Sequence, residues 1–439
     1  MNIEDEAYRQ LLERLFAARR FGVVLGLGRM HQVLARLGDP HRRLGAIVHV
    51  GGTNGKGSTA AMIAAMVSAH GRPVALYTSP HLTSVRERIA VDGAPISKAE
   101  FLDAAAAVAA VGGEALTFFE QLTALAMVAM AQRRPAVTVL EVGLGGRLDA
   151  TNVVDSAVAV VTGVALDHQA VLGDTLELIA AEKAGIFRRD RPAIIGASGE
   201  PAAVPVLQEA AVRAGAQPVQ VVDAAAVAAT PSPGLRGAHQ RRNAAAALAA
   251  VRALVDGGHM VEDAAARARG LSSVQHPGRF EVIAGAPRLV LDGAHNPHGA
   301  HALAEALAGE PAPRVLVLAV SRDKDARALI AALAPAVTCI VATAYRQERA
   351  LPAAELAAQV AEVAPRAVPP HDSAAGVGWA AALPDALAQA RHLAGPAGTV
   401  VIAGSLFLVG EARALLLGAE QDPLALSDPA ATPSAPPPG

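Results

Sequence analysis

Residues 51–58, "GGTNGKGS", combine glycines, a lysine and a serine in an arrangement that suits phosphate binding. The usual phosphate loop has four residues between its first glycine and the Gly-Lys pair, and Ser or Thr directly after the lysine. Here only Thr53 and Asn54 intervene, and Gly57 separates Lys56 from Ser58. An apolar run precedes the stretch and a helical pattern follows it. Because a strand, a glycine turn and a helix start surround an anion with backbone N–H groups, we predict a phosphate site.

Other reactive side chains follow predicted strands. Ser79 ends "PVALYTS", Glu141 ends "VTVLE", Asp167 and His168 follow "AVAVVTGVAL", and Asp292 follows "LVL". Ligands gather at the carboxyl ends of parallel strands, and a carboxylate there is the usual holder of magnesium in NTPases. Each residue taken alone also fits an ordinary turn, and Lys183 alone fits a solvated helix position. "GLGG", residues 143–146, lacks the third glycine of the dinucleotide pattern, which favours a substrate loop.

The elements that must position these residues alternate along the chain. Short apolar runs at 46–50, 73–79, 136–143, 157–164 and 192–197 alternate with helical patterns such as 59–71 and 118–132, after a helical stretch at 6–37. This alternation predicts an α/β fold with a mainly parallel sheet. A second series starts near residue 288. We expect an ATP-binding domain at 1–283, a smaller C-terminal Rossmann-like α/β domain at 284–417, and a disordered Pro/Ala/Ser-rich tail at 418–439.

Composition narrows the class of protein. The chain has 439 residues and a net charge of −2, so no overall basic field attracts nucleic acid or membranes. Its single cysteine, Cys339, lies in the strand-like run "VTCIVAT" and is interpreted as a core residue in a reducing compartment. The acidic N-terminus is unlike a secretory signal, and no apolar run is long enough for a membrane span. We therefore expect a cytoplasmic protein with no nucleic-acid or membrane partner.

Seven motifs in order resemble folylpolyglutamate synthase and dihydrofolate synthase, within the superfamily of ATP-dependent amide ligases that includes the Mur ligases. They are "HVGGTNGKGS", "YTSPHL…RERI", "EVGLGGRLDATN", "LDH…EKAGI", "HPGRFE", "LDGAHNP" and "GSLFLVGE". The resemblance extends from about residue 20 to about residue 417. It implies a large P-loop-type ATPase domain, a smaller C-terminal domain, and an active site in the cleft between them. Val85 departs from the family pattern, where an aromatic residue is expected.

The resemblance also implies roles for matching positions. ATP contacts would be Gly55, Lys56, Gly57, Ser58, Asn243, Arg279 and Asp292, and metal ligands would be Ser79, Glu141 and His168. Folate or pteroate contacts would be Phe119, Glu120, Gln121, Leu148, Asp149 and Ala150, and glutamate contacts would be His295 and Ser405. Lys56, Lys183, Asp292 and His295 would be catalytic. Lys183 matches the lysine that carries a carbamate in this family, near the second of two Mg²⁺ ions.

The implied reaction converts a carboxylate into an acyl phosphate with ATP, and the amino group of L-glutamate then forms an amide. No protein nucleophile is needed, which agrees with the absence of a Gly-x-Ser-x-Gly elbow. The leading hypothesis is a monomeric bifunctional dihydrofolate/folylpolyglutamate synthase. The alternatives are an enzyme with only the polyglutamylating activity, a Mur-type ligase, a kinase or regulatory NTPase, and a non-catalytic nucleotide-binding module.

Overall fold

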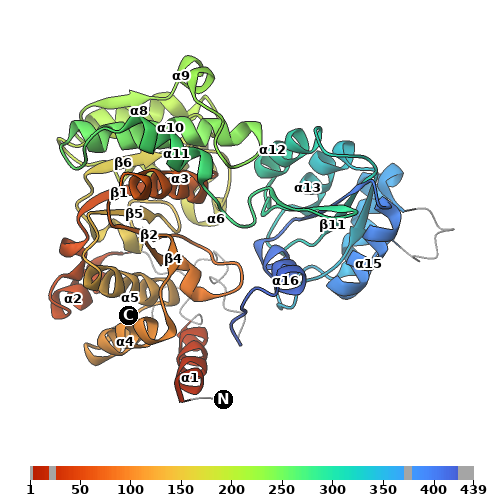
Figure 1. The fold of residues 1–439 in the computed structure, drawn as a ribbon, viewed down its shortest axis with the longest axis horizontal. Helices are drawn as coiled ribbons and strands as arrows, with labels where there is room; N and C mark the ends of the chain where they lie inside the picture. Colours follow the sequence, from red (N-terminus) through yellow and green to blue (C-terminus); the bar gives the residue numbers. More distant parts are fainter. Residues whose placement is uncertain (1–2, 19–25, 370–377, 424–439) are drawn as a thin grey trace.

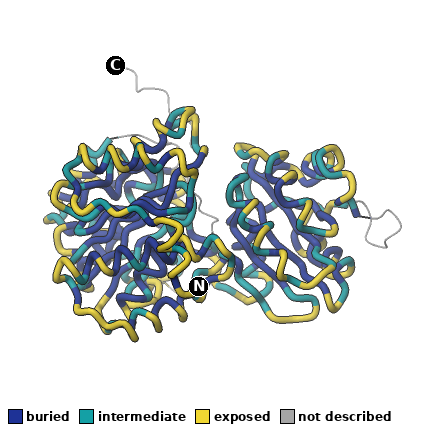
Figure 2. The backbone as a smooth tube through the Cα atoms, turned by 90° about the horizontal axis from the view of Figure 1, so that it is seen from above, coloured by how far each residue is buried: buried dark blue, intermediate teal, exposed yellow. Residues whose placement is uncertain are grey.

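The computed structural model describes residues 3–18, 26–369 and 378–423, which form two α/β bodies side by side (Figure 1). In each body the buried residues lie toward the centre and the exposed residues lie toward the outside (Figure 2). This arrangement confirms the expected fold class, a large domain with a mainly parallel sheet and a smaller C-terminal α/β domain.

The larger body contains an eight-stranded sheet in the order β4-β3-β2-β5-β1-β6-β7-β8. Its strands pair in parallel except at β3 and β4, where the pairing is antiparallel. Because β1 lies between β5 and β6, the loops that follow these three strands meet at one edge. The strands are β1 Ala46–Gly51, β2 Val74–Tyr77, β3 Ile89–Val91, β4 Ala94–Pro95, β5 Val137–Glu141, β6 Val158–Val161, β7 Ala193–Ile195 and β8 Val219–Val221.

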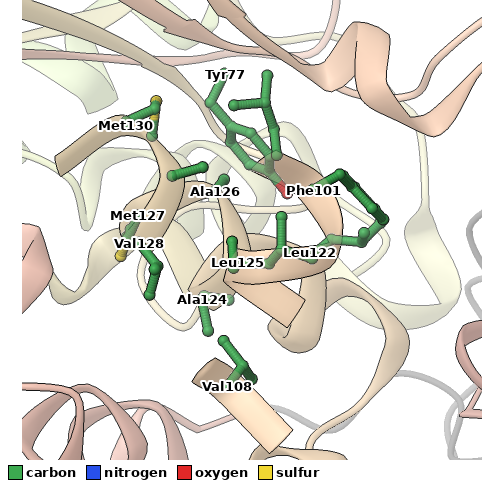
Figure 3. Packing of buried hydrophobic residues seen from close by; sticks show 14 of the residues in the cluster. Tyr77, Phe101, Val108, Leu122, Ala124, Leu125, Ala126, Met127, Val128 and Met130 are labelled. Carbon is green, nitrogen blue, oxygen red and sulfur yellow. The ribbon is translucent and has the colours of Figure 1, made fainter. Parts of the chain in front are cut away.

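Helices cover both faces of this sheet, which explains why its strands read as continuous apolar runs. Successive residues of β1 face opposite layers, so Ile47 packs beneath α4 Lys98–Ala110 and α5 Phe118–Gln132, with α1 Ile3–Ala18 and α2 Gly28–Arg36 nearby. Val48 packs against α3 Lys56–Ala69, α10 Ala238–Asp256 and α11 Ala264–Ser273. Figure 3 shows the apolar side of α5, including Leu122, Leu125 and Met130, in the first of these clusters. The other helices are α6 Gln169–Leu172, α7 Leu176–Ala184, α8 Ala203–Arg213 and α9 Ala224–Ala229, with short 3-10 turns such as η3 Val85–Arg88 and η5 Ala150–Val153.

The smaller body has a five-stranded sheet in the order β12-β11-β13-β10-β9, with β9 antiparallel. Its helices also form two layers, α12–α14 on one face and α15–α16 on the other. Cys339 is a buried core residue of β12, as expected, and burial raises the pKa of its thiol to about 11. The elements are β9 Glu281–Ile283, β10 Arg288–Leu291, α12 Pro297–Leu307, β11 Arg314–Leu318, α13 Ala326–Leu333, β12 Cys339–Ala342, α14 Ala353–Val363, α15 Leu383–Ala394, β13 Thr399–Ala403 and α16 Leu406–Leu417.

Three boundaries differ from the expectation. The stretch 6–37 is divided between α1 and α2, with residues 19–25 outside the described part. Strand β9 pairs with β10, which places residues 281–283 in the second sheet, on the far side of the expected 283/284 boundary. Residues 418–423 of the expected tail are described, and they return to the larger body, where the Asp422 side chain bonds Tyr8 of α1; residues 424–439 lie outside the described part. Within the described residues, no helix is both long and apolar enough to cross a membrane.

Candidate active site

The glycine-lysine loop connects β1 to α3, and its glycines occupy positions that a side chain would obstruct. Gly52 has φ of +140°, and a Cβ there would lie 2.0 Å from Thr162 Oγ1. Gly55 has φ of +82°, and a Cβ there would lie 2.2 Å from Asn243 Oδ1. Both positions therefore require glycine for conformation and for space.

Helix α3 begins at Lys56, directly after Gly55. The N–H groups of its first turn have no partners within the helix, so they are available to an anion, and the helix dipole favours negative charge there. The Lys56 ammonium folds back over the loop and donates to Thr53 O at 3.2 Å. Ser58 is buried in the same turn. These features are those of a phosphate cradle.

Glu141 ends β5, beside the phosphate loop. Its buried carboxylate accepts a hydrogen bond from Ser79 N at 2.9 Å. Burial raises the pKa of Glu141, while Lys56, the Ser79 N–H and Arg279 oppose that rise. A Cβ at Gly57 would lie 3.5 Å from Glu141 Oε2, so the carboxylate stands close to the first turn of α3.

His168 follows β6 and caps α6 with φ of +52°. Burial lowers the pKa of its imidazole to about 4, with Asp167 opposing, so the ring is neutral near pH 7, as a metal ligand must be. The described residues contain no group of three or more His, Cys, Asp or Glu side chains arranged to hold a metal. Mg²⁺ in nucleotide sites is usually bound by one or two carboxylates plus phosphate and water, so the Glu141 carboxylate beside Ser79 suits that ion without an all-protein cage.

Lys183 on α7 is buried, although helix periodicity alone suggests a solvated residue. Its ammonium donates to Gly52 O at 3.1 Å, which places it beside the phosphate loop. Burial and then the charge of Lys56 lower the pKa of Lys183 to about 7. This lowering favours the neutral amine, the form that carbamate formation requires.

The smaller domain supplies the opposite wall. Asp292 follows β10, and its carboxylate accepts from Phe280 N and Ala294 N, both at 2.8 Å. His295 donates from Nδ1 to Gly293 O at 2.8 Å, which leaves Nε2 as the acceptor of a neutral ring. Burial lowers the pKa of His295 to about 4. The carboxylate therefore shapes the loop, and the imidazole offers a lone pair to a ligand.

Ser405 caps α16 by accepting from Phe407 N at 3.2 Å. Around it the structure gathers polar residues that no sequence motif indicated. Ser321 and Tyr345 share a hydrogen bond of 2.6 Å, and Arg349 bonds Asp323 at 3.0 Å. Their signal in the sequence is the polar stretches that follow β11 and β12, "SRDKD" and "AYRQER".

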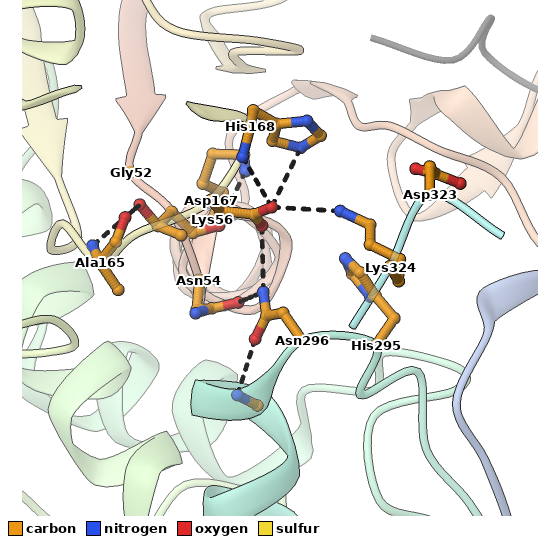
Figure 4. Close-up of polar contacts among 12 residues, drawn as sticks. Gly52, Asn54, Lys56, Ala165, Asp167, His168, His295, Asn296, Asp323 and Lys324 are labelled. Carbon is orange, nitrogen blue, oxygen red and sulfur yellow. Dashed lines mark hydrogen bonds and ion pairs between the residues drawn. The ribbon is translucent and has the colours of Figure 1, made fainter. Parts of the chain in front are cut away.

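Two loops of the larger domain touch the smaller one at this site (Figure 4). Asn296 Nδ2 donates to Asn54 Oδ1 at 3.0 Å and to Asp167 Oδ2 at 3.1 Å. Lys324 Nζ lies 3.1 Å from Asp167 Oδ1. Although burial acts in the opposite direction, His168 and Lys324 hold the pKa of Asp167 below its usual value. Contacts between the domains thus converge on the phosphate loop and the residue before His168.

The side chains expected to contact folate or pteroate differ in the groups that surround them. The Phe119 ring packs on Gly143, where a Cβ would lie 2.3 Å from Cζ. The Glu120 carboxylate accepts hydrogen bonds from Thr117 N at 2.8 Å and from Arg29 Nη2 at 2.9 Å. Asp149 likewise accepts from backbone N–H groups of its own loop, including Leu144 N at 2.9 Å. The two carboxylates therefore hold the walls of the site in shape.

One cavity of about 960 Å³ lies between the domains and brings these groups together. It is lined by every site residue that the sequence predicted except Gln121, whose side chain donates to Leu116 O at 2.8 Å. The Gln121 amide is directed instead toward the backbone carbonyls of Glu114 and Leu116. The predicted residues that line it are Gly55, Lys56, Gly57, Ser58, Ser79, Phe119, Glu120, Glu141, Leu148, Asp149, Ala150, His168, Lys183, Asn243, Arg279, Asp292, His295 and Ser405.

Comparisons with known proteins agree with this division of the chain. Residues 50–228 match the Mur ligase middle domain, and residues 278–406 match the Mur ligase glutamate ligase domain. The chain is 37% identical over 438 residues to a dihydrofolate synthase/folylpolyglutamate synthase of Mycobacterium tuberculosis, covering 89% of each protein.

Two further proteins are similar over most of this chain. A probable bifunctional folylpolyglutamate synthase/dihydropteroate synthase of Haloferax volcanii is 38% identical over 92% of this chain, and the chain spans about half (50%) of that relative's length. A crystal structure of a bifunctional folylpolyglutamate synthase/dihydrofolate synthase with Mn, AMPPNP and L-glutamate bound superposes with a TM-score of 0.78 at 33% identity. The match covers 90% of this chain and 95% of the other.

Proposed function

Because the chain belongs to the folylpolyglutamate synthase and dihydrofolate synthase family of Mur ligases, we propose that its interdomain cavity joins L-glutamate to a folate-type carboxylate using ATP. The observation that carries this proposal is the joint lining of one cavity by the phosphate loop, Glu141 and the C-terminal His295 and Ser405. Such a cavity holds a nucleotide, an acceptor carboxylate and an amine together.

The first step forms an acyl phosphate. An acceptor carboxylate oxygen attacks the γ-phosphorus of ATP, and the bond from that phosphorus to the bridging β–γ oxygen breaks, releasing ADP. Lys56 and the N–H groups at the start of α3 stabilise the charge on the phosphoryl oxygens. Phe119, packed on Gly143, forms an apolar wall against which an aromatic acceptor can stack.

The second step forms the amide. The amino group of glutamate attacks the acyl carbon, the carbon–oxygen bond to phosphate breaks, and phosphate and a proton leave. His295 is suited to orient the amine, because its Nδ1–H is held by Gly293 O and its Nε2 accepts hydrogen bonds. Contacts such as Lys324–Asp167 hold the two domains against each other and limit access of water to the acyl phosphate.

Divalent metal and carbamate also have residues suited to them. Ser79, Glu141 and His168 would hold Mg²⁺, which supplies charge neutralisation for the phosphates when bound. Lys183, buried beside Gly52 with its pKa lowered, is the residue we propose to be carbamylated. This change would convert a cation near Lys56 into an anion.

We further propose that the enzyme is bifunctional, accepting dihydropteroate as well as reduced folates, and that it works as a cytoplasmic monomer. In support of bifunctionality, two relatives of this chain carry both activities in their names. The alternatives are an enzyme limited to polyglutamylation and a Mur-type ligase acting on a cell-wall nucleotide precursor.

The test is ADP release by the purified protein with ATP, Mg²⁺ and glutamate, and with tetrahydrofolate, dihydropteroate or a cell-wall nucleotide precursor as acceptor. Bifunctionality predicts release with the first two and products that gain one glutamyl group by mass spectrometry. Release with tetrahydrofolate alone identifies the single activity. Release with neither folate compound contradicts the assignment, and release with only the cell-wall precursor identifies the Mur-type reaction.

A further inference from the structure

The loop that carries Ser79 reaches out of the larger domain and into the smaller one. Leu82 packs against the apolar cluster beneath α16. On α16 itself, a Cβ at Gly410 would lie 2.1 Å from Leu82 O, so only glycine permits this contact. Gly278, on the segment that joins the domains, also approaches the Leu82 side chain, and a Cβ there would lie 3.2 Å from Leu82 Cδ1.

The same loop is internally braced. The Glu87 carboxylate accepts from Leu82 N at 2.8 Å, Ser84 N at 3.1 Å and Thr83 N at 3.2 Å. At its ends, Thr78 N donates to Arg88 O at 2.9 Å, and Arg88 Nε donates to His81 Nδ1 at 2.9 Å. Residues 78–88 therefore form a closed, hydrogen-bonded unit, which we call the Ser79 loop.

Residues 418–423 follow α16, cross back to the larger domain and contact the Ser79 loop there. The Asp422 carboxylate accepts from Val85 N at 2.7 Å and from the Tyr8 hydroxyl at 2.8 Å. Asp422 N donates to Thr83 O at 3.0 Å. Glu420 lies 2.7 Å from Arg86 and 3.1 Å from Lys98. The segment is thus bonded to α1, α4 and the Ser79 loop.

We propose that Asp422 and Glu420 are positioning residues that fix the Ser79 loop, so that the C-terminal domain sets the placement of Ser79 against Glu141. A short series of hydrogen bonds leads from Asp422 to Glu141. Asp422 accepts from Val85 N, Glu87 accepts from the N–H groups of residues 82–84, Arg88 donates to His81, and Ser79 N donates to Glu141 Oε2. The proposal rests on the proposed function only in taking Ser79 and Glu141 as metal ligands. In addition, residues outside the ATP-binding domain hold Ser79 and Glu141 in their relative positions.

The experiment measures the Mg²⁺ concentration that gives half-maximal binding of a non-hydrolysable ATP analogue, by calorimetry on full-length variants without acceptor or glutamate. Asp422→Asn removes the charge while keeping the size, and Glu420→Gln does so at a more exposed position. Glu355→Gln, an exposed acid on α14, is the matched control. For Asp422→Asn we expect the half-maximal Mg²⁺ concentration to rise roughly tenfold, the scale of one lost charge-assisted hydrogen bond.

Melting temperatures separate positioning from general stabilisation. A lower melting temperature of Asp422→Asn with an Mg²⁺ dependence equal to that of Glu355→Gln would overturn the proposal. If Asp422→Asn does not fold, Glu420→Gln and Tyr8→Phe test the proposal instead. The first removes the charge that pairs with Arg86 and Lys98, and the second removes the hydroxyl bonded to Asp422. An unchanged Mg²⁺ dependence in both variants refutes the proposal. Since no acceptor is present, failure of the folate reaction leaves this test intact.

Discussion

Replacing Gly55 with alanine tests whether the phosphate loop depends on the close approach of Asn243. At Gly55 the backbone has φ of +82°, and a Cβ would lie 2.2 Å from Asn243 Oδ1. Asn243 has little freedom to retreat, because its buried amide is bonded to Ser198 Oγ at 2.7 Å and to Gln240 Oε1 at 2.9 Å. Alanine must therefore displace either the loop or Asn243.

The chain offers a matched control for the backbone term. Gly93, in the turn between β3 and β4, has φ of +83°, and a Cβ added there would have no other atom within 4 Å. Placing alanine in this left-handed region costs about 1–2 kcal/mol of unfolding free energy at either position. For a domain of 150–250 residues, a loss of 1–2 kcal/mol lowers the melting temperature by roughly 2–8 °C. Gly55→Ala adds a steric clash that Gly93→Ala lacks.

The assay is the dissociation constant of a non-hydrolysable ATP analogue together with the melting temperature. We expect Gly93→Ala to bind the analogue as the parent protein does, and Gly55→Ala to bind at least about tenfold more weakly, the equivalent of about 1.4 kcal/mol. The double variant Gly55→Ala/Asn243→Ala should bind no worse than Asn243→Ala, because the clash is gone. Parent-like affinity in Gly55→Ala would refute the reasoning.

Four further outcomes follow from the site. Lys56→Ala should lower ATP turnover at least about 100-fold with an unchanged circular dichroism spectrum, because it removes a charge from the phosphate cradle; near-normal turnover would contradict its role. Lys183 has a folded pKa of about 7 and an ordinary value of 10.5, so its neutral form grows as pH rises through 7. Labelled bicarbonate should then give a carbamate NMR signal that increases over this range and is absent in Lys183→Met. The same shift makes the unfolded state bind more protons between pH 7 and 10.5, so the Lys183 contribution to folding stability improves with pH across that window. Finally, Phe119→Ala should raise the acceptor KM several-fold, whereas Gln121→Ala, outside the cavity wall, should leave it within about twofold; equal effects would place Gln121 in the site.

The sequence predicted the central strands well because their side chains are buried on both sides. Val137–Glu141 and Val158–Val161 appear as apolar runs, and their ends locate Glu141 and Asp167 without any knowledge of tertiary structure. The antiparallel strands Ile89–Val91 and Ala94–Pro95 were not predicted, since two or three residues beside a polar turn give no periodic signal.

Other features depend on contacts that no local pattern contains. The spacing of the short helix that carries Lys183 suits a solvent-exposed face. Lys183 is buried beside Gly52, to which it donates a hydrogen bond and which is 131 residues away in the chain. The Asp167–Lys324 pair joins residues separated by 157 positions. Gln121 was predicted as an acceptor contact by resemblance, and no local pattern indicates that its amide donates to the carbonyl of Leu116.

The return of residues 418–423 to the larger domain limits how the two domains can rotate. The domains are joined once near Gly278 and a second time where Asp422 meets Thr83 and Val85. Once the polar contacts of Asn296 and Lys324 at the cavity are released, two such connections favour rotation about the line through both of them, and rotation about other axes strains one of the joints. Spin labels at the ends of α9 and α14 should therefore report large distance changes during turnover, and labels beside either joint should report little change.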